Sequence, residues 1–150
     1  MGERRYFEDL LVGEELESST HEVVREDMVA FARQYDPQWF HADEDAARDS
    51  IFGEVVASGI YTMALWRRLD HEIASDIAWI CGVAWDDVRF ARALRAGDRI
   101  RARARCLGKR ESASDPRRGV VVFEYKLLND RDEVVFSCRS TNLVERRPLA

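Results

Sequence analysis

The chain has 150 residues, which suits a single domain built around one hydrophobic core. Hydrophobic residues make up 46% of it and charged residues 34%, a composition that excludes an intrinsically disordered chain. The net charge of −5 gives no general support for a nucleic-acid partner. The first ten residues contain no apolar signal core, and no apolar segment is long enough to span a bilayer. We therefore expect one domain, residues 1–150, in a cytoplasmic protein.

The three cysteines, Cys81, Cys106 and Cys138, are odd in number and far apart. They form no CxxC pair and no Cys/His cluster, so the sequence predicts neither a disulfide framework nor a zinc site. We expect three buried, reduced thiols, no metal and no redox cofactor.

The first part of the chain predicts a strand followed by a short helix. Residues 14–24 read as the strand, and residues 25–35 have apolar side chains at helical spacing with acidic residues in the first turn. Pro37 ends this helix, because the residue before a proline is pushed out of the α region. Asp36 and His41 are therefore expected on a compact loop that can bring a carboxylate and an imidazole together.

The longest helix is predicted over residues 60–74, after a brief helical turn over residues 42–50. Ser58 is expected to cap this helix, and Gly59 lets the backbone approach another group closely. The first half of the helix is apolar on nearly every side, so other structure should surround it. The expected inward-facing stripe is Ile60, Met63, Trp66, Leu69 and Ile73.

After about residue 78 the hydrophobic period changes from helical to two, which predicts strands. Residues 100–106 alternate most clearly, with arginines on one face and Ile100, Ala102, Ala104 and Cys106 on the other. The four segments are residues 78–90 (with a break around Gly82), 100–106, 119–128 and 133–145, with turns at 115–119 and 129–133. One curled antiparallel sheet around a central helix accounts for this pattern and places the chain in the α+β class.

The order of these elements, together with several motifs, resembles the MaoC-like dehydratases, relatives of the (R)-specific enoyl-CoA hydratases. The central motifs are YDPQWFHADEDAA at residues 35–47 and FGEVVASG at residues 52–59. Residues 6–16, 88–100 and 110–135 resemble the opening, middle and later segments of the family, so the resemblance covers nearly the whole chain. It implies a single hotdog domain, in which a curled sheet wraps a long central helix.

The resemblance also implies a hydro-lyase and the residues of its site. Asp36 and His41 match the catalytic aspartate and histidine of the family, and Gly59 matches the glycine whose backbone N–H faces the thioester oxygen. Three further residues are expected to shield the loop from water or to contact the substrate: Trp39, Phe40 and Ser58.

Two departures from the family pattern concern the shape of the acyl pocket. The better-known hydratases have Asn and Pro where this chain has Gln38 and Trp39, and Ser58 stands where a histidine often precedes the glycine. These differences predict an acyl substrate other than that of the straight-chain fatty hydratases.

The implied chemistry needs these residue types. In hydration of an α,β-unsaturated thioester, water loses a proton as it attacks Cβ, Cα gains a proton, and negative charge grows on the thioester oxygen. Asp36 and His41 can hold and deprotonate the water, and the sequence leaves open which of them is the base. The Gly59 N–H at a helix start would meet the oxygen. The expected substrate is an acyl-CoA thioester, and the expected assembly is a homodimer or larger, because a single curled sheet leaves an open edge.

Other interpretations stay open. An aspartate and a histidine five positions apart often form only a loop hydrogen bond. A hotdog thioesterase would need an acid or nucleophile on the central helix, whose start has no acid, and a non-catalytic acyl-thioester-binding subunit would need no working pair at all. The cations Lys109, Arg110, Arg117 and Arg118 could meet the phosphates of coenzyme A, although a solvated turn is the favoured interpretation.

Overall fold

The computed structural model describes residues 2–149 of the chain. In that range the helical segments are η1 (Phe7–Asp9), α1 (Arg25–Tyr35), α2 (Trp39–Ala42), α3 (Glu44–Ala47) and α4 (Gly59–Ala74). The strands are β1 (Glu15–Glu17), β2 (His21–Glu22), β3 (Trp79–Phe90), β4 (Arg99–Glu111), β5 (Arg118–Asn129) and β6 (Val134–Glu145).

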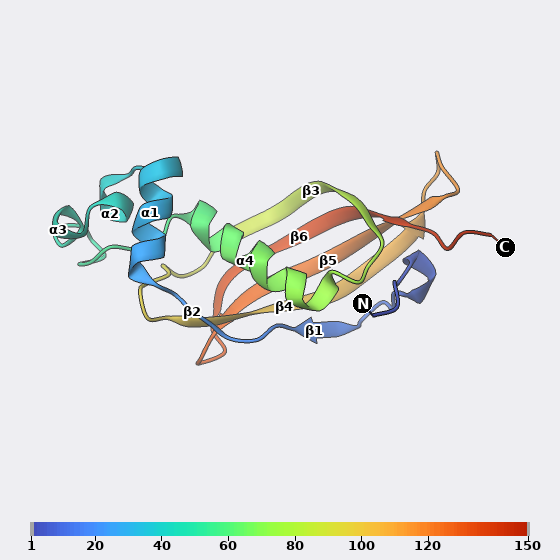
Figure 1. Cartoon of the computed structure of the whole chain (residues 1–150), viewed down its shortest axis with the longest axis horizontal. Helices are drawn as coiled ribbons and strands as arrows, with labels where there is room; N and C mark the ends of the chain where they lie inside the picture. Colours follow the sequence, from blue (N-terminus) through green and yellow to red (C-terminus); the bar gives the residue numbers. More distant parts are fainter. Residues whose placement is uncertain (1, 150) are drawn as a thin grey trace.

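The strands form one antiparallel sheet in the order β1-β4-β5-β6-β3, and the short β2 also pairs with β4. The sheet curls around α4, while α1, α2 and α3 gather at one end of the molecule and both termini lie at the other (Figure 1). This arrangement confirms the expected α+β hotdog fold. No helix among residues 2–149 is long and apolar enough to cross a membrane.

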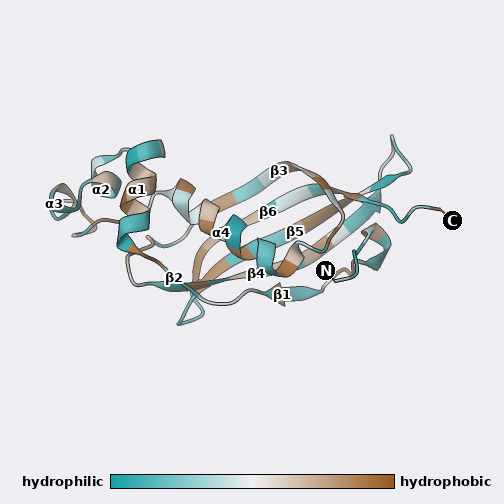
Figure 2. Cartoon of the chain, viewed as in Figure 1, coloured by the Kyte–Doolittle hydropathy of each residue, from teal (hydrophilic) through white to brown (hydrophobic). Residues whose placement is uncertain are grey.

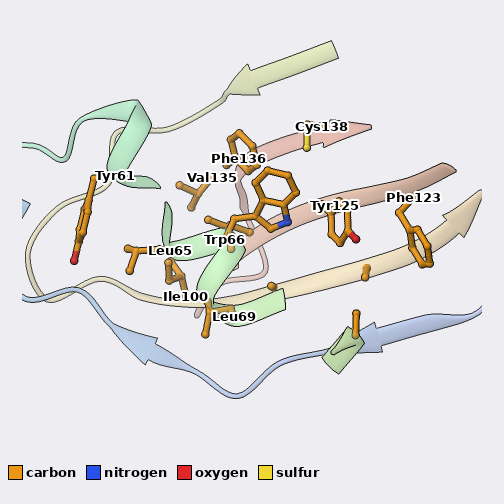
Figure 3. Close-up of a cluster of buried hydrophobic side chains, with 14 of the residues drawn as sticks. Tyr61, Leu65, Trp66, Leu69, Ile100, Phe123, Tyr125, Val135, Phe136 and Cys138 are labelled. Atoms are coloured by element: carbon orange, nitrogen blue, oxygen red, sulfur yellow. The ribbon is translucent and has the colours of Figure 1, made fainter. Parts of the chain in front are cut away.

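The hydrophobic core is centred on Trp66, which points from α4 toward the sheet and is fully buried (Figure 3). Its ring centroid lies 5.0 Å from that of Tyr125 and 5.4 Å from that of Phe136, in tilted contacts that aromatic rings favour. A buried aromatic side chain of this size contributes several kcal/mol, so the contact between α4 and the sheet is a large part of the stability of the fold.

The predicted inner stripe of α4 was partly wrong. Trp66 and Leu69 are buried as expected, but Ile60 is 53% exposed. The buried side chains of the helix are Tyr61, Thr62, Leu65, Trp66, Leu69, Asp70 and Ala74. The first half of the helix is apolar on nearly every side, so its sequence alone does not fix which residues face inward; packing against the sheet decides this.

The alternation predicted for β4 is confirmed. Ile100, Ala102, Ala104 and Cys106 are buried, whereas the arginines between them lie on the outer face. On that face Arg101 pairs with Glu17 of β1. In Figure 2 hydrophobic stretches lie along β5, and the β4–β5 and β5–β6 turns are hydrophilic.

Three other expectations need correction. The single strand expected over residues 14–24 is instead two short strands, β1 and β2, which both pair with β4. Between them the Ala102 N–H of β4 donates to the side-chain Oγ of Ser18 at 2.8 Å, so a side chain replaces the backbone carbonyl and the regular strand pairing is interrupted. His41, which was expected on a loop, lies on the short helix α2. Cys106 and Cys138 are buried, but Cys81 is exposed because it lies on β3 at the edge of the sheet.

We expect Trp66→Ala to lower the free energy of unfolding by about 3–5 kcal/mol, because it removes the central side chain of a packed core. Ile60→Ala, on the exposed side of the same helix, is the control and should cost less than about 1 kcal/mol. Urea unfolding of both variants measures the difference. Similar losses would contradict the burial pattern assigned to α4.

Candidate active site

Asp36 stands directly after α1, and its carboxylate turns toward the start of α4. Its N–H still donates to the carbonyl oxygen of Ala32 at 2.9 Å, but its φ of −152° and ψ of 73° take the chain out of the helix. Pro37 enforces this exit, because it disfavours the α region for the residue before it. The Asp36 side chain keeps 28% of its surface exposed, which leaves it accessible to a small molecule.

His41 is held on α2 with a defined ring orientation. Its Nδ1 lies 2.7 Å from the carbonyl oxygen of Val56. A carbonyl oxygen only accepts hydrogen bonds, so Nδ1 carries the hydrogen, and in the neutral ring Nε2 has the free lone pair. The ring of Phe40 meets His41 edge-on, with the centroids 4.5 Å apart, and further restricts the imidazole.

The structure brings Asp36 and His41 together. His41 Nε2 lies 3.9 Å from Asp36 Oδ2, which is beyond a direct hydrogen bond but close enough for both atoms to contact one small molecule. The basic nitrogen of the imidazole and a carboxylate oxygen therefore face the same point.

Ser58 links this pair to the start of α4 and is fully buried. Its Oγ donates to Asp36 Oδ2 at 2.6 Å and accepts the N–H of Ile60 at 3.2 Å. The single hydroxyl hydrogen is used by Asp36, so the carboxylate acts as an acceptor here. The sequence predicted that Ser58 caps α4, but it did not predict the hydrogen bond from Ser58 to Asp36. A cap hydroxyl also has a hydrogen to donate, and this is the one signal in the sequence that could have suggested such a partner.

Gly59 is the first residue of α4, and its N–H has no acceptor among residues 2–149. The unpaired N–H groups and the dipole of a helix start together favour a negatively charged oxygen. A Cβ at this position would lie 2.9 Å from Cε1 of Phe90, so the backbone is in close contact with the end of β3. Phe90 was not predicted near the site, because it is distant in sequence and no motif marks it.

Trp39 and Phe40 flank the pair but differ in burial. Trp39 is 47% exposed, with its ring 5.5 Å from that of Phe40 in an edge-on contact. Phe40 packs against the core and against Phe52, with the ring centroids 5.8 Å apart. Phe40 therefore anchors α2, and Trp39 presents an apolar surface beside the site.

Three separate segments thus supply an imidazole nitrogen, a carboxylate oxygen and, one residue after the Ser58 that binds this carboxylate, a backbone N–H without an acceptor among residues 2–149. This set can move a proton to and from a bound molecule and can stabilise an oxyanion. Among residues 2–149 no cluster of three or more His, Cys, Asp or Glu side chains is arranged to hold a metal ion.

The chain is similar to known proteins over most of its length. The family model described as a MaoC like domain matches residues 9–125. The crystal structure of the MaoC-like dehydratase from Rhodospirillum rubrum matches with a TM-score of 0.88 and 37% identity, over 97% of this chain and 99% of that one.

Two curated relatives differ in how much they share with this chain. The uncharacterized protein YdeM of Bacillus subtilis is 25% identical over 142 residues, which are 93% of this chain and 98% of the relative. The 3-hydroxyacyl-thioester dehydratase Z of Mycobacterium tuberculosis is 32% identical over 75 residues, which are 49% of this chain and 50% of the relative. The match to that dehydratase therefore spans half the length of each protein.

We expect Ser58→Gly to lower the free energy of unfolding by about 1–3 kcal/mol, the range for a hydrogen bond to a charged group. Glycine is tolerated at an N-cap, so the loss reports chiefly the bond to Asp36. Asp43→Gly is the matched control: Asp43 caps the short helix α3 and is exposed, so its replacement should cost only a few tenths of a kcal/mol. Equal losses would show that Ser58 acts only as a cap.

Proposed function

Because the chain belongs to the MaoC-like dehydratase family, we propose that it adds water to an enoyl thioester or removes it from a 3-hydroxyacyl thioester. The observation that carries this proposal is the position of His41 Nε2 beside Asp36 Oδ2, at 3.9 Å, next to the free N–H of Gly59. Water addition to an unsaturated thioester requires a base, a proton donor and an oxyanion site, and these three groups supply them.

In the proposed hydration, one water contacts His41 Nε2 and Asp36 Oδ2, each at about 2.8 Å. The neutral imidazole removes a proton from this water as its oxygen bonds to Cβ. The resulting imidazolium lies beside the Asp36 carboxylate, which stabilises its charge. His41 then returns the proton to Cα as the enolate collapses, so the product is the 3-hydroxyacyl thioester and both residues regain their starting states.

The enolate oxygen would accept a hydrogen bond from the Gly59 N–H. One donor of this kind typically contributes a factor of about 10²–10³ in rate. Ser58 acts as a positioning residue, since it is buried and holds Asp36 through its hydroxyl. Dehydration uses the same groups in reverse order.

We further propose that coenzyme A is the thiol that carries the acyl group, and that the protein works as a homodimer or larger assembly. The name of the Mycobacterium tuberculosis relative, a 3-hydroxyacyl-thioester dehydratase, supports a thioester substrate. The partly exposed Trp39 would line the acyl slot beside the catalytic pair.

The thioesterase alternative has less support from the structure. The one buried acid of α4 within the described range is Asp70, which pairs with Arg67 at 2.9 Å. It follows Gly59 by eleven residues, so it lies about 16 Å further along the helix axis. A carboxylate at that distance is too far from the Gly59 N–H to act on the same carbonyl group.

The test is loss of enoyl absorbance with a panel of short, branched and dicarboxylic enoyl-CoA substrates. Asp36→Asn and His41→Ala should each lower kcat by a factor of about 10² or more, because His41 transfers the proton and the Asp36 carboxylate holds the water and stabilises the imidazolium. His71→Ala, an exposed histidine on α4, is the control and should have wild-type activity. Thiol release in place of hydration would favour the thioesterase, and tight binding without either signal would favour a non-catalytic subunit.

Gly59→Ala tests the oxyanion site. The added methyl group lies against the half-exposed ring of Phe90, which has room to turn away, so we expect a change in stability of no more than about 1 kcal/mol. We expect kcat/KM to fall by about 10² or more, because the methyl group blocks approach to the N–H. The double variant with Phe90→Ala has space for the methyl group. If the double variant is as active as Phe90→Ala alone, the loss in Gly59→Ala came from displacement of Phe90. If the double variant is much less active than Phe90→Ala, the blocked N–H caused the loss.

A further inference from the structure

The short segment before α4, residues 52–57, positions both members of the candidate pair. The carbonyl oxygen of Val56 lies 2.7 Å from His41 Nδ1. The segment leads directly to Ser58, whose Oγ donates to Asp36 at 2.6 Å. It belongs to no helix and no strand, so its position depends on contacts with neighbouring elements.

The first of these contacts comes from the connection between β3 and β4. This connection runs past the start of α4, at the end of the molecule that holds α1, α2 and α3 (Figure 1). Val56 and Arg95 form an isolated antiparallel bridge, and the Ala57 N–H donates to the carbonyl oxygen of Leu94 at 2.8 Å. The backbone at Val56 is therefore held by a strand-like contact with residues 94 and 95.

The side chain of Arg95 attaches to the same segment a second time. Its Nη1 donates to the carbonyl oxygen of Phe52 at 2.9 Å and to Glu54 Oε1 at 2.9 Å. A terminal guanidinium nitrogen carries two hydrogens, so each acceptor receives its own. The ion pair with Glu54 lies near the surface and by itself contributes little, whereas the bond to the Phe52 carbonyl fixes the backbone of the segment.

The backbone of Arg95 is itself fixed by a tight turn. Its N–H donates to Asp98 Oδ2 at 2.8 Å, and Gly97 has a φ of 86°, a conformation that favours glycine. The turn is bound to Val23, because the Gly97 N–H donates to the Val23 carbonyl oxygen and the Val23 N–H donates to the Asp98 carbonyl oxygen, both at 2.8 Å. One turn, residues 95–98, thus connects the segment before α4 with the chain that enters α1.

We infer that Arg95 is a positioning residue for His41. Its guanidinium group holds the segment before α4 and thereby fixes the direction of the Val56 carbonyl group, which orients the imidazole. The effect on catalysis rests on the proposed function, in which the lone pair of Nε2 points to the water and Nδ1 keeps its hydrogen. A displacement of about 1 Å can cost a factor of about 10² in rate, so this attachment matters for proton transfer.

A neighbouring arginine provides a matched control. Arg92 and Arg95 line the same depression of about 320 Å³. Arg92, however, pairs with Glu133, and within the described part of the chain it donates no hydrogen bond to residues 52–57. A mere loss of positive charge from this depression would affect variants of both arginines alike, whereas loss of the attachment affects only those of Arg95.

The first measurement is nuclear magnetic resonance of protein with isotopically labelled histidine ring nitrogens. The chain has three histidines, and the spectrum of His41→Ala assigns the signals of His41. In the wild type and in Arg92→Met, the hydrogen of the neutral His41 ring should reside on Nδ1. In Arg95→Met, which keeps a long side chain without donors, both ring nitrogens should share it. An unchanged His41 in Arg95→Met would overturn the inference.

The second measurement is steady-state kinetics with an enoyl-CoA substrate. Arg95→Met should lower kcat by about tenfold with little change in KM, because the orientation of the base changes and the binding of substrate does not. Arg95→Lys should recover part of this loss, since an ammonium group can donate to either acceptor but lacks the planar fork of a guanidinium. Arg92→Met should keep the wild-type kcat. A higher KM with unchanged kcat in Arg95→Met would overturn the inference.

The two measurements separate this inference from the proposed function. If the wild type hydrates no thioester while the His41 signals still change in Arg95→Met, the proposed function is wrong and the positioning by Arg95 stands. If hydration depends on His41 while Arg95→Met has the wild-type signals and the wild-type kcat, the proposed function stands and the inference is overturned.

Discussion

The structure depends on the burial of one face of α4 in the concave side of the sheet. Trp66, which is fully buried, makes the central contact with Tyr125 and Phe136. This contact fixes the rotation of the helix and therefore the direction in which its first residues point. The sheet curls around this helix, and the strand order leaves β3 at one edge.

The candidate active site follows from the position of that helix start. Ser58 caps α4 and at the same time holds Asp36, so the residue that ends one helix is tied to the beginning of another. His41 is oriented by the carbonyl oxygen of Val56, only two residues before Ser58. Asp36 and His41 are thus both positioned by contacts with the short segment before α4, which brings a carboxylate and an imidazole from two different elements together.

The charges of the chain are distributed unevenly over the fold. The net charge of −5 disfavours anions in general, but the arginines are not spread evenly. Four arginines line a groove of about 840 Å³ at the end of the molecule opposite to the acidic α2–α3 segment: Arg117, Arg118, Arg146 and Arg147. The two ends of the molecule therefore differ in charge.

The amino-acid sequence by itself determined the order and most of the bounds of the long elements, because period and caps are local properties. The alternation in β4, the break around Gly82, the exit from α1 at Pro37 and the start of α4 at Gly59 were all predicted from neighbouring residues. The motifs around Asp36, His41 and Gly59 were enough to name the family. Only the tertiary structure decided which face of α4 is buried, that Ser58 holds Asp36, that Phe90 contacts Gly59, and that β3 is the exposed edge. These features depend on contacts between residues far apart in the chain, and no local pattern records them.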